Sequence, residues 1–455
     1  MKQIITAKLK LVTTPEQHHS LRETQLAYRD GLNYTSFYAF EHGKLSNAER
    51  LQQGVYREIR ARFKLPSQMA CNVPRQVAAL YKGLWTKLKQ NLVHRKAGHT
   101  KKRYKGLDKP PKYVSPTLTY NYGYDYSFKS EQQVSVLTLH GRIILPYQGY
   151  DRHVALIQHG TTIGAAKLWY DKPHKQYYLL VSLELDIPET APERLPNVVG
   201  VDVGMRYLAT TATTSNQSHF YPGKRVRARA DHYARLRQRL QKKGTRSATR
   251  RKIALGGRER RLKRQTNHTI AKEIVQAHPY TLIGLEELTG IRERTKRRRR
   301  RRKRNGKGTE PVSKKARRAN RHASQWAFAE LHGMVAYKAA LSRTALAVKV
   351  DADYTSQRCP LCGYTDKRNR PQKGLLFICQ NPLCPHRQRT GQPYTLHADL
   401  VGARNIAMRT LLVRQDWMRT GHLSVAPDVS DHETKAARLK RFAELRWSSD
   451  ASSPR

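Results

Sequence analysis

Three acidic side chains interrupt runs of the sequence that are otherwise apolar. Asp202 lies in VVGVDVG, Glu286 follows TLIGL, and Asp399 lies in LHADLVGARNIA. An unpaired buried carboxylate costs several kcal/mol, so acids in such places normally pair or bind a metal. Each one alone has an ordinary explanation, because an Asp near a strand end is usually a turn or cap residue. Together they predict carboxylates gathered around two Mg²⁺ or Mn²⁺ ions, the kind of site that hydrolyses phosphodiester bonds.

Four of the five cysteines are clustered with the spacing C-x₂-C-x₁₆-C-x₄-C. Paired cysteines without a secreted disulfide pattern are typical of a closed tetrahedral Zn²⁺ site, which leaves no open position for catalysis. The alternatives are unligated thiols, a redox pair, or a site in which His386 or His397 replaces a cysteine. A zinc knuckle too small to hold its own core folds on the metal, so we expect a structural ribbon that fixes the nearby Asp399. The four predicted ligands are Cys359, Cys362, Cys379 and Cys384.

The charge balance predicts a polyanionic partner. The chain carries 87 Lys and Arg against 34 Asp and Glu, a formal net charge of +53. Self-repulsion on this scale opposes a compact fold unless a polyanion neutralises it. A solubility surface or a ribosomal-type protein would be the alternatives, but the basic residues are interspersed through segments that have regular secondary-structure patterns. Nucleic acid is therefore the expected partner.

Two basic segments are candidate contacts for that partner. Residues 230–277 place Arg or Lys at every second to fourth position of a helical pattern with few compensating acids, so we expect them to follow the phosphates of a duplex. The run KRRRRRRKR at 296–304 is expected in a disordered loop that contacts RNA or DNA near the active site; a nuclear signal or a merely solvated loop are the alternatives. The candidate residues are Arg235, Arg239, Arg250, Arg251, Lys296, Arg297 and Arg298.

The elements that must position these residues follow from hydrophobic periodicity. Residues 2–12 alternate as a strand, 16–94 have helical spacing, and 113–185 return to alternation, including HVALIQHG at 153–160. This order predicts an antiparallel β domain that is completed by the first strand and carries a helical insertion. After a proline-rich linker at 188–197, apolar strands that carry the acids alternate with helices.

The sequence also bears on the compartment. It has no run of about 18 apolar residues and no signal-peptide core at its N-terminus. The clustered cysteines and the lone Cys71 suit a reducing cytosol. We expect no membrane association and a cytoplasmic, nucleoid-associated protein of a bacterium or archaeon.

The acidic segments and the cysteine region resemble, in order and spacing, the three-part RuvC-like nuclease of the transposon-encoded TnpB proteins, which are relatives of the type V CRISPR effector nucleases. The similarity covers about residues 196–412, and its most specific parts are TSQ-C-x-x-C-G and ARNIA. It implies a multidomain α/β fold: an RNase H-like (RuvC) nuclease with an inserted zinc ribbon, preceded by an antiparallel β-barrel wedge domain that carries a helical recognition insertion.

The sequence patterns and the resemblance together predict domain boundaries. They are 1–15 for the first strand of the wedge barrel, 16–97 for the helical recognition domain, 98–190 for the remainder of the wedge, 191–354 for the first part of the nuclease, 355–390 for the zinc ribbon, 391–412 for the third nuclease motif, and 413–455 for a flexible C-terminal tail.

Carried over by position, Asp202, Glu286 and Asp399 match the catalytic acids of the family and would hold the Mg²⁺ ions. Glu287 is the neighbour of the second acid, and strand alternation places it on the opposite face.

Two more residues are candidates for the site, and the sequence differs from the family pattern at two places. Arg404 and Asn405, about one helical turn beyond Asp399, are candidates for supporting the scissile phosphate. Many family members carry Asn where this chain has Val401, which puts a detail of the active site in doubt. The second cysteine pair is C-x₄-C instead of the usual C-x₂-C, which hardly affects zinc binding.

The family's activity is the main functional expectation. It implies an RNA-guided endodeoxyribonuclease that uses a transposon-encoded guide RNA, one protein per guide, to cut double-stranded and also single-stranded target DNA beside a short flanking motif. A compact type V CRISPR effector and a guide-dependent DNA-binding repressor without cleavage are the alternatives. A DNA-rearranging transposase is disfavoured because the chain offers no matching Tyr or integrase-type spacing.

Overall fold

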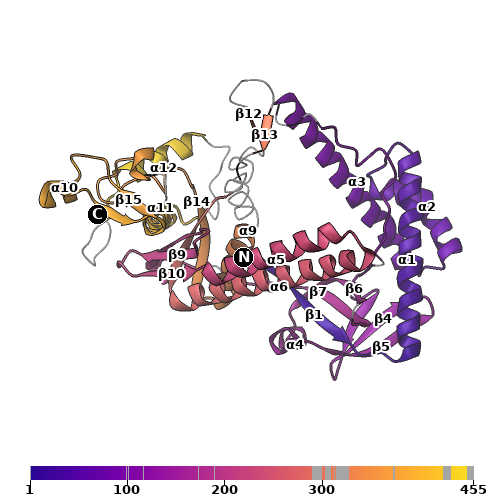
Figure 1. Ribbon diagram of the computed structural model, residues 1–455. Helices are drawn as coiled ribbons and strands as arrows, with labels where there is room; N and C mark the ends of the chain where they lie inside the picture. The colour runs from indigo at the N-terminus through magenta and orange to yellow at the C-terminus, as the bar shows by residue number, and fades with distance from the viewer. Residues whose placement is uncertain are drawn as a thin grey trace. The chain divides into compact units, whose positions relative to one another are not determined.

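The chain divides into two units, Met1–Asp186 and Ile187–Arg455, and each is described by itself (Figure 1). The computed structural model describes residues 2–98, 100, 102–115, 117–172, 174–188, 190–288, 313, 327–371, 375–423 and 432–447, and the backbone of 300–302 and 309–311. Among these residues, no helix is both long enough and apolar enough to cross a membrane.

The first unit is built on a seven-stranded antiparallel sheet in the order β2-β6-β7-β1-β5-β4-β3. Its strands are β1 (Lys2–Leu11), β2 (Leu118–Tyr120), β3 (Tyr126–Lys129), β4 (Gln133–Thr138), β5 (Gly141–Gln148), β6 (Thr162–Asp171) and β7 (Gln176–Asp186). A bridge between Tyr122 and Tyr126 links the segment after β2 to β3, so the sheet is nearly closed into a barrel. β1 pairs with β7 from Lys2 to Lys10, which confirms the prediction that the first strand completes this sheet.

Three helices are inserted between β1 and β2. They are α1 (Pro15–Glu41), α2 (Ala48–Phe63) and α3 (Ser67–Lys96). Thr14 begins α1 with a capping box: its hydroxyl accepts a hydrogen bond from the Gln17 backbone N–H, and the Gln17 side chain accepts one from the Thr14 backbone N–H. In α2, Leu51, Val55 and Ile59 are buried at intervals of four residues, which places them on one face.

The prediction of a strand at 153–160 is wrong. The structure forms helix α4 (Asp151–Gln158) there. Its buried residues, Val154 and Ile157, are three positions apart and so lie on one face of a helix, whereas a strand would direct them to opposite faces. A segment this short fits both periods, and tertiary packing decides between them.

The second unit contains a five-stranded sheet in the order β10-β9-β8-β11-β14. Its strands are β8 (Asn197–Asp202), β9 (Tyr207–Thr213), β10 (Ser218–Pro222), β11 (Thr281–Glu286) and β14 (Ala345–Val350). β8, β9 and β10 are antiparallel neighbours, whereas β8, β11 and β14 run parallel to one another. The continuous apolar runs in β8 and β11 fit parallel strands that are covered on both faces.

Helices cover both faces of this sheet, and strand alternation decides which residues meet which helix. The helices are α5 (Lys224–Lys243), α6 (Arg246–Ala277), α9 (Phe328–Ser342) and α11 (Ala398–Thr420). Val199 and Ile283 pack in a core with residues of α6 and α9. Val198 and Leu282 pack in a second core with residues of α11. Because faces alternate, Asp202, four residues after Val198, lies on the α11 side of the sheet.

A small region rich in turns interrupts the second unit before α11. It contains η2 (Lys367–Asn369), β15 (Leu376–Ile378), α10 (Pro385–Thr390) and β16 (Thr395–His397). β15 and β16 pair antiparallel, and Leu376 lies opposite His397. The predicted hairpin arm around the third cysteine is therefore present, and its second strand runs directly into α11.

The expectation of a flexible tail from residue 413 is wrong in part. α11 continues to Thr420, and α12 (His432–Glu444) follows. Val413 and Trp417 are buried, and so are Phe442 and Trp447 near the end of the chain. The apolar residues of this segment recur at helical spacing and pack into a core of the second unit with residues of β8 and β11. Residues 424–431 and 448–455 lie outside the described part of the chain.

The predicted loop at 296–304 is described only in part. Arg300–Arg302 form β12, which pairs antiparallel with β13 (Thr309–Pro311). Lys296, Arg297 and Arg298 lie outside the described residues.

Candidate metal centres

The first two predicted acids lie side by side at the carboxyl ends of neighbouring parallel strands. The register pairs Leu285 of β11 with Val201 of β8, so Glu286 and Asp202 follow at the same level. Both belong to the face of the sheet that α11 covers. Each retains part of its surface exposed, so a ligand has access to them.

The third acid reaches this place from the first turn of α11. His397 precedes the helix as its N-cap, and its Nδ1 accepts a hydrogen bond of 3.3 Å from the Asp399 backbone N–H. A methyl group added to Gly402, one turn later, would lie 2.9 Å from the Asp202 carboxyl carbon. The start of α11 therefore lies directly against Asp202, and the positive end of the helix dipole faces the acids.

Glycines in the sheet permit this close approach. A side chain at Gly200 of β8 would collide with the backbone of Ala403 and Ala407, and one at Gly284 of β11 would collide with Thr410. These glycines share a strand face with Asp202 and Glu286, two residues before each acid. The sequence thus leaves a side-chain-free track along which α11 rests on the strands.

The electrostatics of the group are those of carboxylates held close together. The pKa of Asp202 is raised well above its ordinary value, first by burial and then by the negative charges of Glu286 and Asp399. The pKa of Asp399 is also raised by burial, and the positive charges of His397 and Arg370 partly oppose this.

Glu286 has its own supporting contacts. Burial raises its pKa, while a hydrogen bond from Thr355 and the positive charge of Arg409 oppose the rise. The Thr355 hydroxyl donates to Glu286 Oε1 at 2.6 Å. The neighbouring Glu287 forms an ion pair of 3.0 Å with Lys349 instead, as expected for the opposite face of the strand.

The donor chemistry of the three acids fits hard divalent cations. The pKa of each of the three carboxyl groups is raised, so each stays protonated at a higher pH than usual. Binding of a cation displaces these protons. The carboxylate oxygens of the three acids do not all lie within 4.8 Å of one another. Among the described residues, only the four cysteines form a possible metal-binding group that is this compact. Two ions about 3.5–4 Å apart, each with bonds of about 2.0–2.1 Å, distribute their ligands over a wider space than a single ion does.

Arg404 and Asn405, which were predicted to support the scissile phosphate, have hydrogen-bond partners within the protein. Arg404 donates to the Tyr394 hydroxyl at 3.0 Å and to Asn216 Oδ1 at 3.3 Å. Asn405 is fully buried, and its amide donates to the backbone carbonyls of Thr355 and Arg358. Asn405 is therefore enclosed by protein, whereas a role for the half-buried Arg404 at the scissile phosphate stays a prediction.

The structure also brings in residues that the sequence did not single out. Thr355 contacts Glu286, Arg409 lies close enough to affect its ionisation, and Arg370 lowers the pKa of both Asp202 and Asp399. Thr355 is the only one with a sequence signal, because it belongs to the family-specific TSQ element. The two arginines do not differ in the sequence from the many others of this basic chain.

The four predicted cysteines converge as expected for a metal site. The sulfur atoms of Cys359, Cys362, Cys379 and Cys384 all lie within 4.8 Å of one another. Cys362 and Cys379 are 3.6 Å apart, close to the ~3.8 Å expected around a tetrahedral Zn²⁺ with bonds of about 2.3 Å. The cluster can therefore hold zinc.

Neither histidine alternative belongs to this cysteine cluster. His386 Nδ1 lies 3.2 Å from the Gln392 carbonyl, and His397 caps α11.

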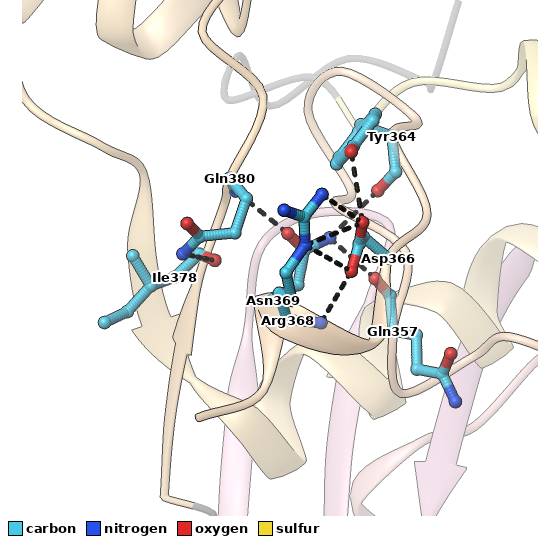
Figure 2. A network of polar contacts seen from close by, with 7 residues as sticks. All are labelled: Gln357, Tyr364, Asp366, Arg368, Asn369, Ile378 and Gln380. Atoms are coloured by element: carbon cyan, nitrogen blue, oxygen red, sulfur yellow. Dashed lines mark hydrogen bonds and ion pairs between the residues drawn. The ribbon is translucent and has the colours of Figure 1, made fainter. Parts of the chain in front are cut away.

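A buried asparagine ties the two cysteine pairs together (Figure 2). The Asn369 amide donates to the carbonyls of Gln357 at 2.8 Å and Tyr364 at 3.2 Å, on either side of the first pair. Its oxygen accepts a 2.9 Å hydrogen bond from the backbone N–H of Gln380, which follows the third cysteine. Asp366 caps the short helix that carries Asn369. The loops thus hold the thiols together through hydrogen bonds as well as through any bound metal.

The cysteine region packs directly on the start of α11. Phe377, Tyr394 and Val401 form one buried cluster with Cys359, Cys379 and Cys384. Val401 is two residues from Asp399 in the same helix. The position of the third acid is therefore coupled to the cysteine site by direct packing, as the proximity of the two motifs suggested.

The predicted basic helices are α5 and α6, which lie alongside each other (Figure 1). Between them is a cavity of about 390 Å³ with an apolar floor. Its charged rim consists of Arg239, Lys243, Arg251 and Arg258. The four predicted contacts of this segment, Arg235, Arg239, Arg250 and Arg251, are all exposed. None has an acidic partner within the described parts of the chain, whereas the partly buried Arg237 pairs with Glu259 at 2.6 Å.

Comparisons with known proteins agree with this geometry. A family model described as "Probable transposase" (OrfB_IS605) matches residues 179–289, and one described as "Cas12f1-like, TNB domain" matches residues 328–406. The first covers β8 and β11, and the second covers the cysteine site and the start of α11.

Three curated relatives were found. They are "CRISPR-associated endodeoxyribonuclease Cas12f2" of Micrarchaeota archaeon (strain CG1_02_47_40), with 25% identity over 52% of this chain; "Putative RNA-guided DNA endonuclease InsQ" of Escherichia coli (strain K12), with 26% over 62%; and "CRISPR-associated endodeoxyribonuclease Cas12f1" of Sulfoacidibacillus thermotolerans, with 24% over 54%. The matches span 40%, 66% and 53% of the relatives' own lengths. A solved structure of a Cas12f1–sgRNA–target DNA complex aligns over 87% of this chain and 83% of its own, with 14% identity and a TM-score of 0.48.

The family models and curated relatives define a class of proteins that joins transposon-encoded and CRISPR-associated nucleases. Within that class, the chain is similar to the transposon-encoded proteins over residues 179–289 and to the Cas12f1-like proteins over residues 328–406.

Proposed function

We propose that this protein is an RNA-guided DNA endonuclease that cuts target DNA by two-metal hydrolysis at Asp202, Glu286 and Asp399. The observation that carries the proposal is the meeting of these three carboxylates, from β8, β11 and α11, at one edge of the second sheet. The names of the relatives support the activity. The sheet order supports an RNase H-like, RuvC-type nuclease, and the nearly closed sheet of the first unit supports a wedge barrel with a recognition insertion.

In this mechanism the chain's own residues hold and orient the chemistry. Asp202, Glu286 and Asp399 would bind two Mg²⁺ or Mn²⁺ ions, which supply charge stabilisation and a water of lowered pKa. Thr355 orients the Glu286 carboxylate through its hydrogen bond. The positive charge of Arg370 favours the ionised forms of Asp202 and Asp399. The partial exposure of the acids leaves room for a phosphodiester to approach.

The remaining parts of the molecule are assigned supporting roles. The four cysteines would hold a structural Zn²⁺, because a site with four thiolates has no open position for a reacting group. The exposed arginines of α5 and α6 would bind the phosphates of the guide RNA or of its duplex with the target.

Isosteric substitutions of the acids test the proposal. We expect Asp202→Asn, Glu286→Gln and Asp399→Asn each to reduce the cleavage rate by about 10³-fold or more, because each removes a ligand that stabilises charge in the transition state. Guide-RNA affinity should be unchanged, because the acids do not bind RNA. The assay measures cleavage of a matched target by the protein loaded with RNA from its native locus.

Glu287→Gln is the matched control. It removes a carboxylate one position away, on the opposite strand face, where the side chain pairs with Lys349. Its cleavage rate should stay within about threefold of the parent. Full cleavage by the three acid variants would refute the site. A protein that binds target DNA under guidance but never cuts it would be a repressor.

A further inference from the structure

The C-terminal segment 436–447 packs against the residues that surround Glu286. Phe442 is 1% exposed and Trp447 is 4% exposed. The Trp447 backbone N–H donates to the Pro360 carbonyl at 2.9 Å, within the first cysteine pair. Its indole Nε1 donates to Asn216 Oδ1 at 2.7 Å. Trp447 is therefore held by specific hydrogen bonds as well as by burial.

A buried arginine depends on this segment for its hydrogen bonds. Arg358 is 1% exposed and has no acidic partner among the residues that the structure describes. Its Nη2 donates to the carbonyls of Ala443 and Leu445, and its Nη1 donates to Asn405 Oδ1 at 3.4 Å. A buried cation is tolerated only when its donors are satisfied. The C-terminal segment supplies two of these three oxygen acceptors.

Phe442 also joins two guanidinium groups. The Arg358 guanidinium carbon lies 4.4 Å from the centre of the Phe442 ring, and that of Arg409 lies 4.0 Å from the same centre. An aromatic ring attracts a cation over its face, so the ring holds both arginines where they would otherwise repel each other. Arg409 in turn donates to the Asp353 carbonyl at 2.6 Å.

These contacts continue to the second acid without a break. The Asn405 amide, which accepts from Arg358, donates to the carbonyls of Thr355 at 2.7 Å and Arg358 at 2.9 Å. The Thr355 hydroxyl donates to Glu286 Oε1 at 2.6 Å. The path from Phe442 to Glu286 therefore runs through the buried side chains of Arg358 and Asn405. It ends at Thr355, which contacts Glu286.

We infer that residues 436–447 are a positioning element that holds the 353–358 loop, and through Thr355 the Glu286 carboxylate, in the geometry that binds divalent cations. The inference rests on the proposed function, because it takes Glu286 as a cation ligand. Residues that hold a metal ligand through a hydrogen bond commonly change metal affinity by about 10–100-fold when they are removed. The C-terminal segment is therefore part of the metal centre.

A double-mutant cycle on the full chain tests this coupling. Thr355→Val removes the hydroxyl and keeps the shape, whereas Phe442→Leu keeps an apolar side chain and removes the ring face that the two arginines share. The probe is Mn²⁺, whose binding is measured by the loss of the free-ion magnetic resonance signal, without any cleavage. Each single variant should weaken Mn²⁺ binding by about tenfold. The Mn²⁺ affinity of the double variant should be close to that of the single variant that binds Mn²⁺ less tightly, because both substitutions act through the same contact.

Rescue and control variants separate positioning from general damage. Thr355→Ser keeps the hydroxyl and should restore most of the Mn²⁺ affinity. Lys440→Ala changes an exposed residue of α12 and should have no effect. Guide-RNA affinity and zinc content should be those of the parent in every variant. If Phe442→Leu does not fold, Trp447→Phe takes its place; it removes the indole hydrogen bond to Asn216 and leaves a smaller ring beneath the Arg404 guanidinium.

Two outcomes overturn different claims. Mn²⁺ binding that is insensitive to Asp202→Asn would remove the proposed function itself. Mn²⁺ binding that depends on Asp202 but not on Phe442, or additive effects in the double variant, would remove only the role of the C-terminal segment.

Discussion

At the scale of single residues, Asp202 carries the largest electrostatic penalty of the proposed site. Burial and two neighbouring carboxylates all disfavour its ionised form, and only Arg370 and a backbone hydrogen bond oppose them. Its pKa in the folded chain therefore lies above that in the unfolded chain. Over the interval between the two values the folded state holds a proton that the unfolded state has lost, so stability falls as the pH rises through it.

This penalty predicts that the Asp202 carboxylate destabilises the metal-free protein. Asp202→Asn should raise the free energy of unfolding at neutral pH by roughly 1–2 kcal/mol, because a neutral amide replaces a crowded charge. Thermal unfolding in the presence of a chelator, at mildly acidic and at neutral pH, measures the effect. The gain should shrink towards acidic pH, where the parent carboxyl is protonated. Glu287→Gln, whose parent side chain has a lysine partner, should give no gain; equal gains in both variants would contradict the argument.

The sequence predicted the acids better than their surroundings, and the reason is periodicity. Asp202 and Glu286 interrupt apolar strands, a pattern that one sequence reveals. Arg404 and Asn405 were predicted as active-site residues because they follow Asp399 closely. At about 100° per residue, however, they lie about 140° and 120° around the helix from it. Their contacts on other faces of α11 follow from that rotation.

At the scale of elements, two packing contacts determine the position of α11. Gly200 and Gly284 let the helix rest on the strands, and the cysteine region packs on its first turn through Val401. Cysteine spacing alone predicted that the four thiols converge, and the structure places them together. The sequence did not predict α12 or α4, because in short or highly charged segments local patterns are ambiguous and distant partners decide the structure.

The packing of the cysteine region predicts what zinc removal does. A strong chelator, or Cys379→Ser, should release the metal, loosen the first turn of α11 and lower the cleavage rate by about tenfold or more. Zinc content, thermal unfolding and cleavage are measured on the same samples. Cys71→Ser is the matched control, because Cys71 lies in α3 and outside the cluster. Undiminished cleavage by zinc-free protein would show that Asp399 is positioned without the ribbon.

At the scale of the whole molecule, the charge of +53 is unevenly used. In α5 and α6 some cations are engaged within the protein: Glu259 accepts ion pairs from Arg237 at 2.6 Å and Lys263 at 3.1 Å. Others, such as Arg239 and Arg251, are exposed at the rim of the cavity between the helices. Composition indicates a polyanionic partner, but only the structure distinguishes cations that pair within the protein from cations that are exposed.

That distinction predicts a salt dependence that differs between neighbouring arginines. Each phosphate contact releases about 0.7–0.9 counterion, so Arg239→Gln with Arg251→Gln should reduce the slope of log affinity against log salt by about 1.5. Guide-RNA binding titrated across a range of salt concentrations measures this slope. Arg237→Gln removes the same charge from the same helix, but its guanidinium is held by Glu259. It should leave the slope unchanged and lower the unfolding temperature, because Glu259 would lose a partner in a buried position. Equal slopes for the parent and the double variant would mean that α5 and α6 do not follow the RNA backbone, and that the unpaired arginines serve only to keep the molecule apart from its own copies.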